Sequence, residues 1–379
     1  MNEVRVIALL AVSMIFASPI RAQDKPQQGT SDWPTRPLHF IVPFPAGGST
    51  DVGARVIANH LTRSLAQQIV VENKSGANGN IGIEAAAKGT PDGYTILVAT
   101  DSVSSNPHVY KMNIDPLREL VPIIQLSRQP IVLAAHPSLG VASLAELIAL
   151  AKQQPGLRYA TGGGYGTPQH MVVQWFASIA ELKLEQVPYR GGAPAINDLL
   201  AGHVKLGSLG STPLIAHYKV GTLRLLAQST LARSPSLLDV PTYQEAGIKG
   251  LVLDQWLGVF VPAGTPPEIA VRLNAEINNA LAEASVRESF LQSAQEPIGG
   301  TAAQFARPRA RRLRQICATG AGTRHQNQLV TLTMELGNHD AASSPDWLRA
   351  QRPSTQGCIM PAGTSHLASH RLTQFEMAV

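Results

Sequence analysis

Cysteine is almost missing from this chain of 379 residues. The two that it has, Cys317 and Cys358, both lie beyond residue 306. The first 306 residues therefore need no disulfide to fold, and they can offer neither a thiolate metal ligand nor a cysteine nucleophile. Aromatic residues are also scarce, at 5%, which argues against a surface that stacks nucleobases.

An excess of basic charge is confined to one part of the chain. The net charge is +5, but residues 307–379 hold nine of the 31 basic and four of the 26 acidic residues. The rest carries 22 of each and is neutral. A protein that follows phosphate groups needs a basic patch on its folded body, so we expect no nucleic-acid partner. Hydrophobic residues, at 44%, suffice for globular cores.

The chain has one markedly apolar stretch, at its start. Val6–Ala17 follows Arg5 and precedes Ile20-Arg21-Ala22. A bilayer crossing needs about 20 apolar residues, and this run is shorter, so a short membrane anchor is the weaker alternative. The pattern predicts a signal peptide over residues 1–22, cleaved near Ala22 for export to the periplasm. Residues 23–32 are polar and read as a linker.

From residue 33 the chain alternates between predicted strands and helices. Apolar runs such as Leu38–Val42 alternate with helical patterns such as residues 50–65, and this order indicates βαβ units with parallel sheets. The pattern begins again after two apolar runs, Ile123–Leu126 and Ile131–Ala135. We therefore expect an α/β protein with two lobes. The first spans residues 33–127 and returns over 236–306, and the second spans 128–235.

Three glycine loops follow predicted strands and precede helices, at Pro43–Asp51, Tyr159–His170 and Val187–Gly202. A helix start offers free N–H groups and partial positive charge, which suit a carboxylate. Each loop could equally be an ordinary tight turn. Thr161 and Thr167 could add hydroxyl donors, while His170 is more often structural in such a position. Arg190 could pair with a carboxylate or lie on the surface.

The motifs of several enzyme classes are absent from the sequence. It contains no G-x-S-x-G, no H-E-x-x-H and no Walker motif, and the second loop does not complete G-x-G-x-x-G. We therefore expect binding without turnover, with no catalytic residue, no metal and no cofactor. A nucleotide-dependent oxidoreductase or a small-molecule lyase is the rival class.

Five motifs together resemble a known family. They are Val42–Asp51, Glu72–Gly82, Pro91–Tyr94, Tyr189–Pro194 and Trp256–Pro266. In order and spacing, from about Trp33 to Phe305, they are similar to the substrate-binding receptors of tripartite tricarboxylate transporters, the Bug family of periplasmic proteins. The resemblance implies a periplasmic binding protein-like (type 2) Venus-flytrap fold. It also implies capture of a small organic carboxylate for a membrane permease, by a protein that we expect to be monomeric. A ligand-presenting partner of a sensor system would use the same fold.

Carried over onto this sequence, the resemblance implies that the cleft is built largely from backbone N–H groups and hydroxyls. Asp51 is expected to brace its loop or cap the helix, because it would repel an anion. The likeness ends at about Ala306. The Arg-rich segment 307–379 is atypical, and we interpret it as an out-of-frame or otherwise aberrant extension, with a genuine tail as the alternative. The implied ligand-binding residues are Phe44, Ala46, Gly47, Gly48, Asp51, Ser102, Ser104, Thr161, Gly162, Gly163, Gly164, His170, Tyr189 and Gly191.

Overall fold

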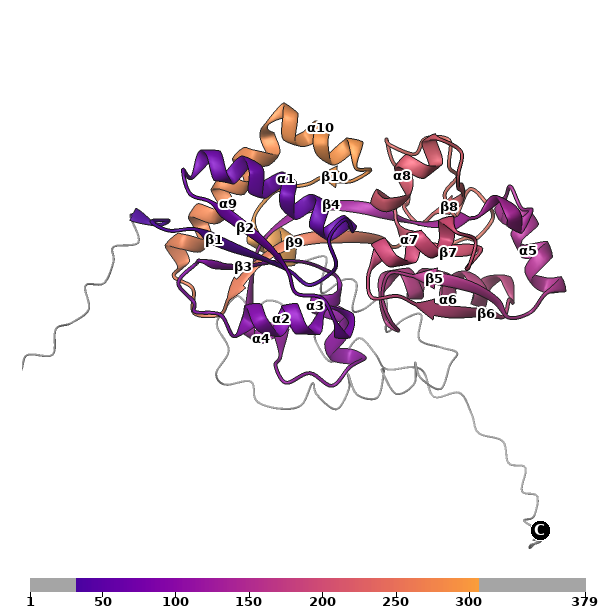
Figure 1. Cartoon of the computed structure of the whole chain (residues 1–379), viewed down its shortest axis with the longest axis horizontal. Helices are drawn as coiled ribbons and strands as arrows, with labels where there is room; N and C mark the ends of the chain where they lie inside the picture. Colours follow the sequence, from indigo (N-terminus) through magenta and orange to yellow (C-terminus); the bar gives the residue numbers. More distant parts are fainter. Residues whose placement is uncertain (1–31, 307–379) are drawn as a thin grey trace, which may run out of the picture.

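The structure, a computed structural model, describes residues 32–306 (Figure 1). The predicted signal peptide, most of the linker and the Arg-rich segment lie outside these residues. The first lobe is built on a sheet in the order β2-β1-β3-β9-β4. β1 pairs in parallel with β2 and β3, whereas β9 runs antiparallel to both β3 and β4. The strands are β1 (Leu38–Val42), β2 (Ile69–Asn73), β3 (Thr95–Thr100), β4 (Leu120–Ala135), β9 (Asp254–Pro262) and the short β10 (Glu296–Pro297), which pairs with β4.

Helices cover both faces of this sheet. The stripe Ile269, Leu273, Ile277 and Leu281 is almost fully buried in one core, and each such side chain contributes about 1.5–3 kcal/mol through burial. Phe305, in the helical residues 302–306, packs on the opposite face. α1, α9 and α10 cover the first face and α2 the second. The helices are α1 (Ser49–Ser64), η2 (Ala77–Gly79), α2 (Asn80–Ala87), α3 (Ser102–Ser105), η3 (Asn106–His108), α4 (Pro116–Glu119), α9 (Pro267–Ala282) and α10 (Ala284–Gln292).

The second lobe repeats the α/β plan on a smaller sheet. The far end of β4 pairs antiparallel with β7 and β8, while β5 pairs in parallel with β6 and β7. Alternate residues of β4 face opposite cores, Ile131 and Leu133 against α5 and α6, and Val132 and Ala134 against α7 and α8. The elements are η4 (Pro137–Leu139), α5 (Leu144–Gln153), β5 (Leu157–Thr161), α6 (Pro168–Ala180), β6 (Leu184–Pro188), α7 (Gly192–Leu200), β7 (Leu206–Gly210), α8 (Thr212–Lys219) and β8 (Arg224–Gln228).

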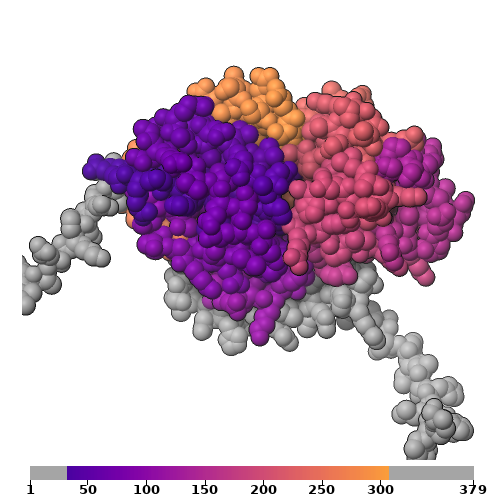
Figure 2. Space-filling view, in the orientation of Figure 1, coloured from indigo at the N-terminus to yellow at the C-terminus, as the bar shows by residue number. Residues whose placement is uncertain are grey.

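Two strands connect the lobes. β4 leaves the first lobe and β9 returns to it, paired along their length from Leu120–Pro262 to Pro130–Asp254. Figure 1 shows both strands running through the middle of the molecule between the lobes. On the face in view in Figure 2, the lobes lie directly against each other. This pair of strands is the position at which the lobes can rotate relative to one another.

Three expectations from the sequence were wrong. The two apolar runs around Arg128–Pro130 form the single strand β4, since pairing with β9 continues through them. The return to the first lobe comes at Asp254 rather than at residue 236, because Leu237, Tyr243 and Leu253 pack in the second lobe. The sheets are mixed, not wholly parallel. No helix between residues 32 and 306 is long and apolar enough to cross a membrane.

Candidate functional site

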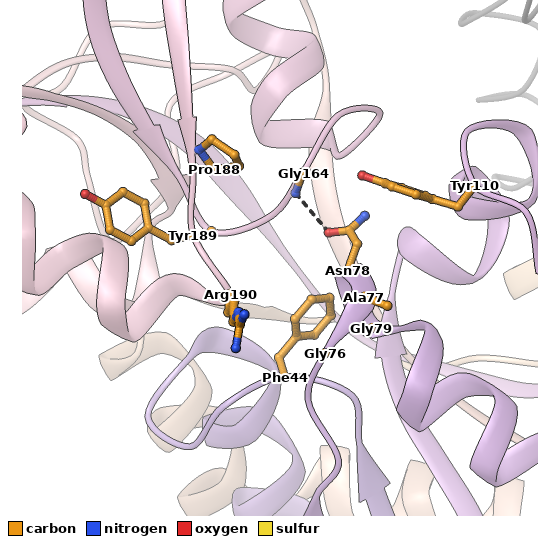
Figure 3. A pocket seen from close by; sticks show the side chains of 11 residues that line it. Phe44, Gly76, Ala77, Asn78, Gly79, Tyr110, Gly164, Pro188, Tyr189 and Arg190 are labelled. Carbon is orange, nitrogen blue, oxygen red and sulfur yellow. Dashed lines mark hydrogen bonds between the residues drawn. The ribbon is translucent and has the colours of Figure 1, made fainter.

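A cavity of about 270 Å³ lies between the two lobes (Figure 3). Eleven residues line it, and each lobe supplies about half. The first lobe contributes Phe44, Gly76, Ala77, Asn78, Gly79 and Tyr110, and the second contributes Gly162, Gly164, Pro188, Tyr189 and Arg190.

The fold explains why these loops meet. Phe44 follows β1, Gly76–Gly79 follow β2, Gly162 and Gly164 follow β5, and residues 189–190 follow β6. All four strands end at the cavity with their carboxyl ends, where ligands bind in open α/β sheets. The predicted pattern of strand, glycine loop and helix occurs beside this cavity in both lobes.

The loop after β5 presents two backbone N–H groups to oxygen acceptors. Gly162 donates to Oε1 of Gln169 at 2.8 Å, and Gly164 donates to Oδ1 of Asn78 at 3.1 Å. Both acceptors are side-chain amide oxygens, and the second comes from the other lobe. A carboxylate oxygen accepts such bonds more strongly than a neutral amide. Each amide oxygen thus marks a position in which an oxygen of an anionic ligand would be stabilised.

The same loop has little room for side chains. A Cβ atom on Gly163 would lie 2.6 Å from Oδ1 of Asn78, and one on Gly162 would lie 2.9 Å from the Gly192 nitrogen. The loop is fastened from within, because the Thr161 hydroxyl donates to the Gly163 carbonyl at 2.6 Å and accepts from Gln186 at 2.7 Å. Thr161 is fully buried. Its hydroxyl therefore holds the loop in shape and does not point into the cavity.

Asn78 holds its position through a cluster of asparagines. Its backbone is left-handed (φ 56°, ψ 33°), a conformation that asparagine tolerates better than most residues. Its Nδ2 donates to Oδ1 of Asn106 at 2.9 Å, and Asn106 donates back to the Asn78 carbonyl. Because Nδ2 is engaged in this way, Oδ1 faces Gly164, as the dashed line in Figure 3 shows.

A second hydrogen bond and a close backbone approach also join the lobes. The Tyr110 hydroxyl donates to the Tyr165 carbonyl at 3.0 Å. A Cβ atom on Gly191 would lie 2.5 Å from Cδ of Pro45. These contacts show the lobes closed around the cavity.

The loop after β1 is organised by Asp51. Its carboxylate accepts from the Gly47 N–H, from Nε of Arg55 and from Nδ2 of Asn73, each at 3.0 Å. Burial by itself raises the pKa of Asp51, but the hydrogen bonds from Arg55, Gly47 and Asn73 outweigh it and hold the pKa below its usual value. Asp51 thus braces the loop, as expected. The Gly47 N–H donates to Asp51 within the loop, and its expected role in a ligand cradle stays a prediction.

His170 lies outside the lining, and Tyr189 lines the cavity with its hydroxyl engaged elsewhere. Burial lowers the pKa of His170 to about 4, so the ring is neutral at pH 7, and its Nδ1 accepts the Gly166 N–H at 3.4 Å. Burial, and then the hydrogen bond to Asp198, raise the pKa of Tyr189 to about 12. Its hydroxyl donates to Asp198 at 2.7 Å, and Figure 3 shows the ring turned away from the other lining side chains.

Arg190 is the lining residue with a formal charge at neutral pH. The lining contains no Asp, Glu or Lys. Within residues 32–306, Arg190 makes no ion pair, unlike Arg55, which pairs with Asp51. The same described region contains no group of three or more His, Cys, Asp or Glu residues that could hold a metal ion.

The structure brings together only part of the predicted set. Phe44, Gly162, Gly164 and Tyr189 line the cavity, while Gly163 and Gly191 lie behind the lining and against the first lobe. Ser102 and Ser104 are buried in α3. Neither these serines nor Ala46, Gly47, Gly48, Asp51, Thr161 and His170 are among the lining residues.

The sequence reasoning did not select seven lining residues. Four of them belong to the polar loop after β2, which carried the family motif Glu72–Gly82 and could have been chosen on that signal. Pro188 adjoins a residue that was chosen, and for Arg190 the sequence left open whether it pairs with a carboxylate or lies on the surface. Tyr110 had no signal in the sequence. The lining residues outside the predicted set are Gly76, Ala77, Asn78, Gly79, Tyr110, Pro188 and Arg190.

Comparison with known proteins assigns the chain to a family. The sequence profile of the tripartite tricarboxylate transporter family receptors matches residues 53–318. The match extends past Ala306, so the expectation that the likeness ends there was wrong. Protein BugT of Bordetella pertussis is 36% identical over 310 residues, which cover 79% of this chain and 92% of that protein.

Two solved structures show the same fold. Rpa4515 of R. palustris with adipate is 32% identical, with a TM-score of 0.71 over 80% of this chain and 97% of that one. MatC of Rhodopseudomonas palustris with bound malate is 27% identical, with a TM-score of 0.65 over 69% and 90%. The expected periplasmic binding protein fold is thereby confirmed. The chain belongs to the tripartite tricarboxylate transporter receptor family.

Proposed function

We propose that this chain is a periplasmic receptor that captures a small organic carboxylate between its lobes and delivers it to the membrane subunits of a tripartite transporter. The observation that carries the proposal is the lining of the cavity. Two backbone N–H groups bind oxygen acceptors there, Arg190 adds positive charge, and the lining contains no acidic residue. Such a lining favours an anion over a neutral or cationic solute.

The relatives support this choice of ligand class. Rpa4515 and MatC hold adipate and malate, and both molecules are small carboxylates. The lining residues also favour binding over turnover, because they include no Ser, Cys, His, Asp or Glu that could act as a nucleophile or a general base.

The mechanism follows from contacts that only the closed arrangement makes. The Tyr110–Tyr165 hydrogen bond and the packing of Gly191 on Pro45 join residues of different lobes and are lost when the lobes separate. A carboxylate that binds one loop in the open form gains further contacts on closure. It therefore shifts the population toward the closed form, with β4 and β9 as the connection between the lobes. The closed form is the one that we expect the permease to recognise.

A binding screen tests the first half of the proposal. The purified secreted protein is melted alone and with di- and tricarboxylates, monocarboxylates, aromatic acids, amino acids and nicotinamide. Ligand at about 100 times Kd stabilises a folded protein by about 2.7 kcal/mol, which raises the melting temperature by several degrees. Stabilisation by carboxylates alone supports the proposal, whereas a sharp melting transition that no carboxylate moves refutes it.

An uptake measurement tests the second half. Cells that express the receptor together with the membrane subunits of a tripartite transporter from the same organism should accumulate the radiolabelled ligand, and deletion of the receptor alone should abolish this uptake. Undiminished uptake without the receptor would show that it serves another system.

A further inference from the structure

Arg190 differs from Arg55 and Arg128 because no acid within residues 32–306 holds it. Arg55 is bound by Asp51, and Arg128 is bound by Glu296 at 2.8 Å. Arg190 makes no such pair within residues 32–306, although it lines the cavity. A guanidinium is a planar, permanent donor that binds a carboxylate through two parallel hydrogen bonds. The cavity therefore contains an anion-binding group that the protein leaves free.

The backbone around Arg190 is held in place by both lobes. Before it, the Tyr189 N–H donates to the Thr161 carbonyl at 2.9 Å, which ties residue 189 to the glycine loop. After it, Gly191 packs against Pro45 of the first lobe. The start of the Arg190 side chain is thus fixed at the cleft when the lobes close, while its end stays exposed.

The N–H groups and the guanidinium are two separate anion positions. Figure 3 shows Arg190 beside Phe44, apart from Gly164 and its bond to Asn78. One carboxylate cannot occupy both positions, but the two ends of one molecule can. An aliphatic diacid, which has a carboxylate at each end, supplies both of these groups.

We propose that Arg190 is a specificity-determining residue, which binds the second carboxylate of an aliphatic dicarboxylate whose first carboxylate displaces the amide oxygens of Gln169 and Asn78 from the Gly162 and Gly164 N–H groups. The inference rests on the proposed function and goes further, because it assigns ligand selectivity to one side chain. The aromatic face of Phe44 lies between the two positions and packs against the methylene groups.

The test separates charge from shape. Succinate, glutarate and adipate are each compared with their monoamides, which keep the size of the diacid and lose one charge. Affinities are measured by titration calorimetry for the full secreted chain, for R190Q and for R158Q. Arg158 is a matched control because it is an exposed arginine of the same lobe, paired with Glu185 and outside the cavity lining. R190K, which keeps the charge but not the planar fork, provides a second variant.

Unaltered protein should bind its preferred diacid about 10- to 100-fold more tightly than the monoamide, as expected for a hydrogen-bonded charge pair. R190Q should abolish that preference by weakening diacid binding alone, R190K should retain part of it, and R158Q should retain all of it. In the opposite outcome, R190Q binds the diacid as tightly as unaltered protein does, or binds the diacid and the monoamide more weakly by the same factor. Either result would show that Arg190 does not bind the second carboxylate, and would leave the proposed capture of a carboxylate unaffected. If unaltered protein binds no carboxylate, the proposed function itself fails.

Discussion

Gly166 offers a test of whether the closed arrangement is the one that binds ligand. It lies in the loop before α6 with φ +76°, and a Cβ atom there would lie well inside the van der Waals contact distance to Cγ2 of Val109, on the first lobe. Valine has little freedom to rotate away. The clash disappears when the lobes separate, so Gly166→Ala should oppose closure specifically.

The backbone cost of that change can be measured independently. Gly140 has nearly the same φ, +79°, and no atom lies within 4 Å of its added Cβ. Gly140→Ala should therefore cost only the left-handed strain of about 1–2 kcal/mol. Gly166→Ala should lose a similar amount of stability without ligand, as measured by urea unfolding. It should also bind the carboxylate found in the screen about 5- to 150-fold more weakly, which corresponds to about 1–3 kcal/mol of overpacking.

A second substitution identifies the cause. Val109→Ala removes the obstructing methyl groups, so the double variant should regain most of the lost affinity in a double-mutant cycle. Calorimetric titration gives the affinities of both single variants and of the double variant. Affinity that is unchanged in Gly166→Ala, or a loss that Val109→Ala does not repair, would refute the view that these lobe contacts form around the ligand.

Three further predictions concern groups around the site. The folded pKa of Asp51 is lowered, so this carboxylate stabilises the protein above its unfolded pKa of about 3.9, and the benefit is lost as pH falls through the folded value. The Asp51→Asn variant should be less stable than unaltered protein at neutral pH, and this difference in stability should shrink as the pH falls. Urea unfolding midpoints of both proteins, measured across pH, test this; a difference that stays constant would contradict it. The pKa of His170 is about 4 when folded and about 6.5 when unfolded. Stability should therefore fall as pH decreases from about 6.5 to about 4, and His170→Gln should remove that part of the decline; identical profiles would count against it. Tyr110→Phe should weaken ligand binding several-fold by removing a hydrogen bond between the lobes. Tyr189→Phe should leave affinity unchanged, because its hydroxyl binds Asp198, and equal losses in both would show that these roles are wrong.

Local patterns predicted much of the fold. β1 spans the expected residues, α5 begins after its Ser143 cap, and Pro168 opens α6 as its missing N–H allows. The prediction failed between the runs Ile123–Leu126 and Ile131–Ala135, because β4 continues from one to the other by pairing with β9, a strand more than a hundred residues later. A pairing strand so far along the chain leaves no pattern in the sequence around β4. The lobe boundary was misplaced for a related reason. Tyr243 packs in the core of the second lobe, and this tertiary contact cannot be inferred from the local sequence.

The site was predictable to the extent that it depends on backbone. Glycine loops at strand ends located Gly162 and Gly164, since such a loop has few alternatives. Side-chain direction was not predictable. Tyr189 was expected in the cleft but turns to Asp198, whereas Asn78 was not chosen and reaches Gly164 across the cleft. In each case the outcome depends on which neighbour supplies a hydrogen-bond partner.

The backbone and the side chains of the cleft contribute differently to the choice of ligand. Backbone N–H groups recognise any carboxylate, and changing them means changing the loop and its fit to Asn78 and Gly192. Arg190 and Tyr110 are not constrained in this way. Their side chains line the cleft and belong to neither lobe's hydrophobic core, so their loss leaves these cores intact. Substitution at these two positions can thus alter which molecule is preferred while the fold and the capture of carboxylates persist. Selectivity should accordingly respond to single substitutions there, whereas the binding of carboxylates should weaken but persist.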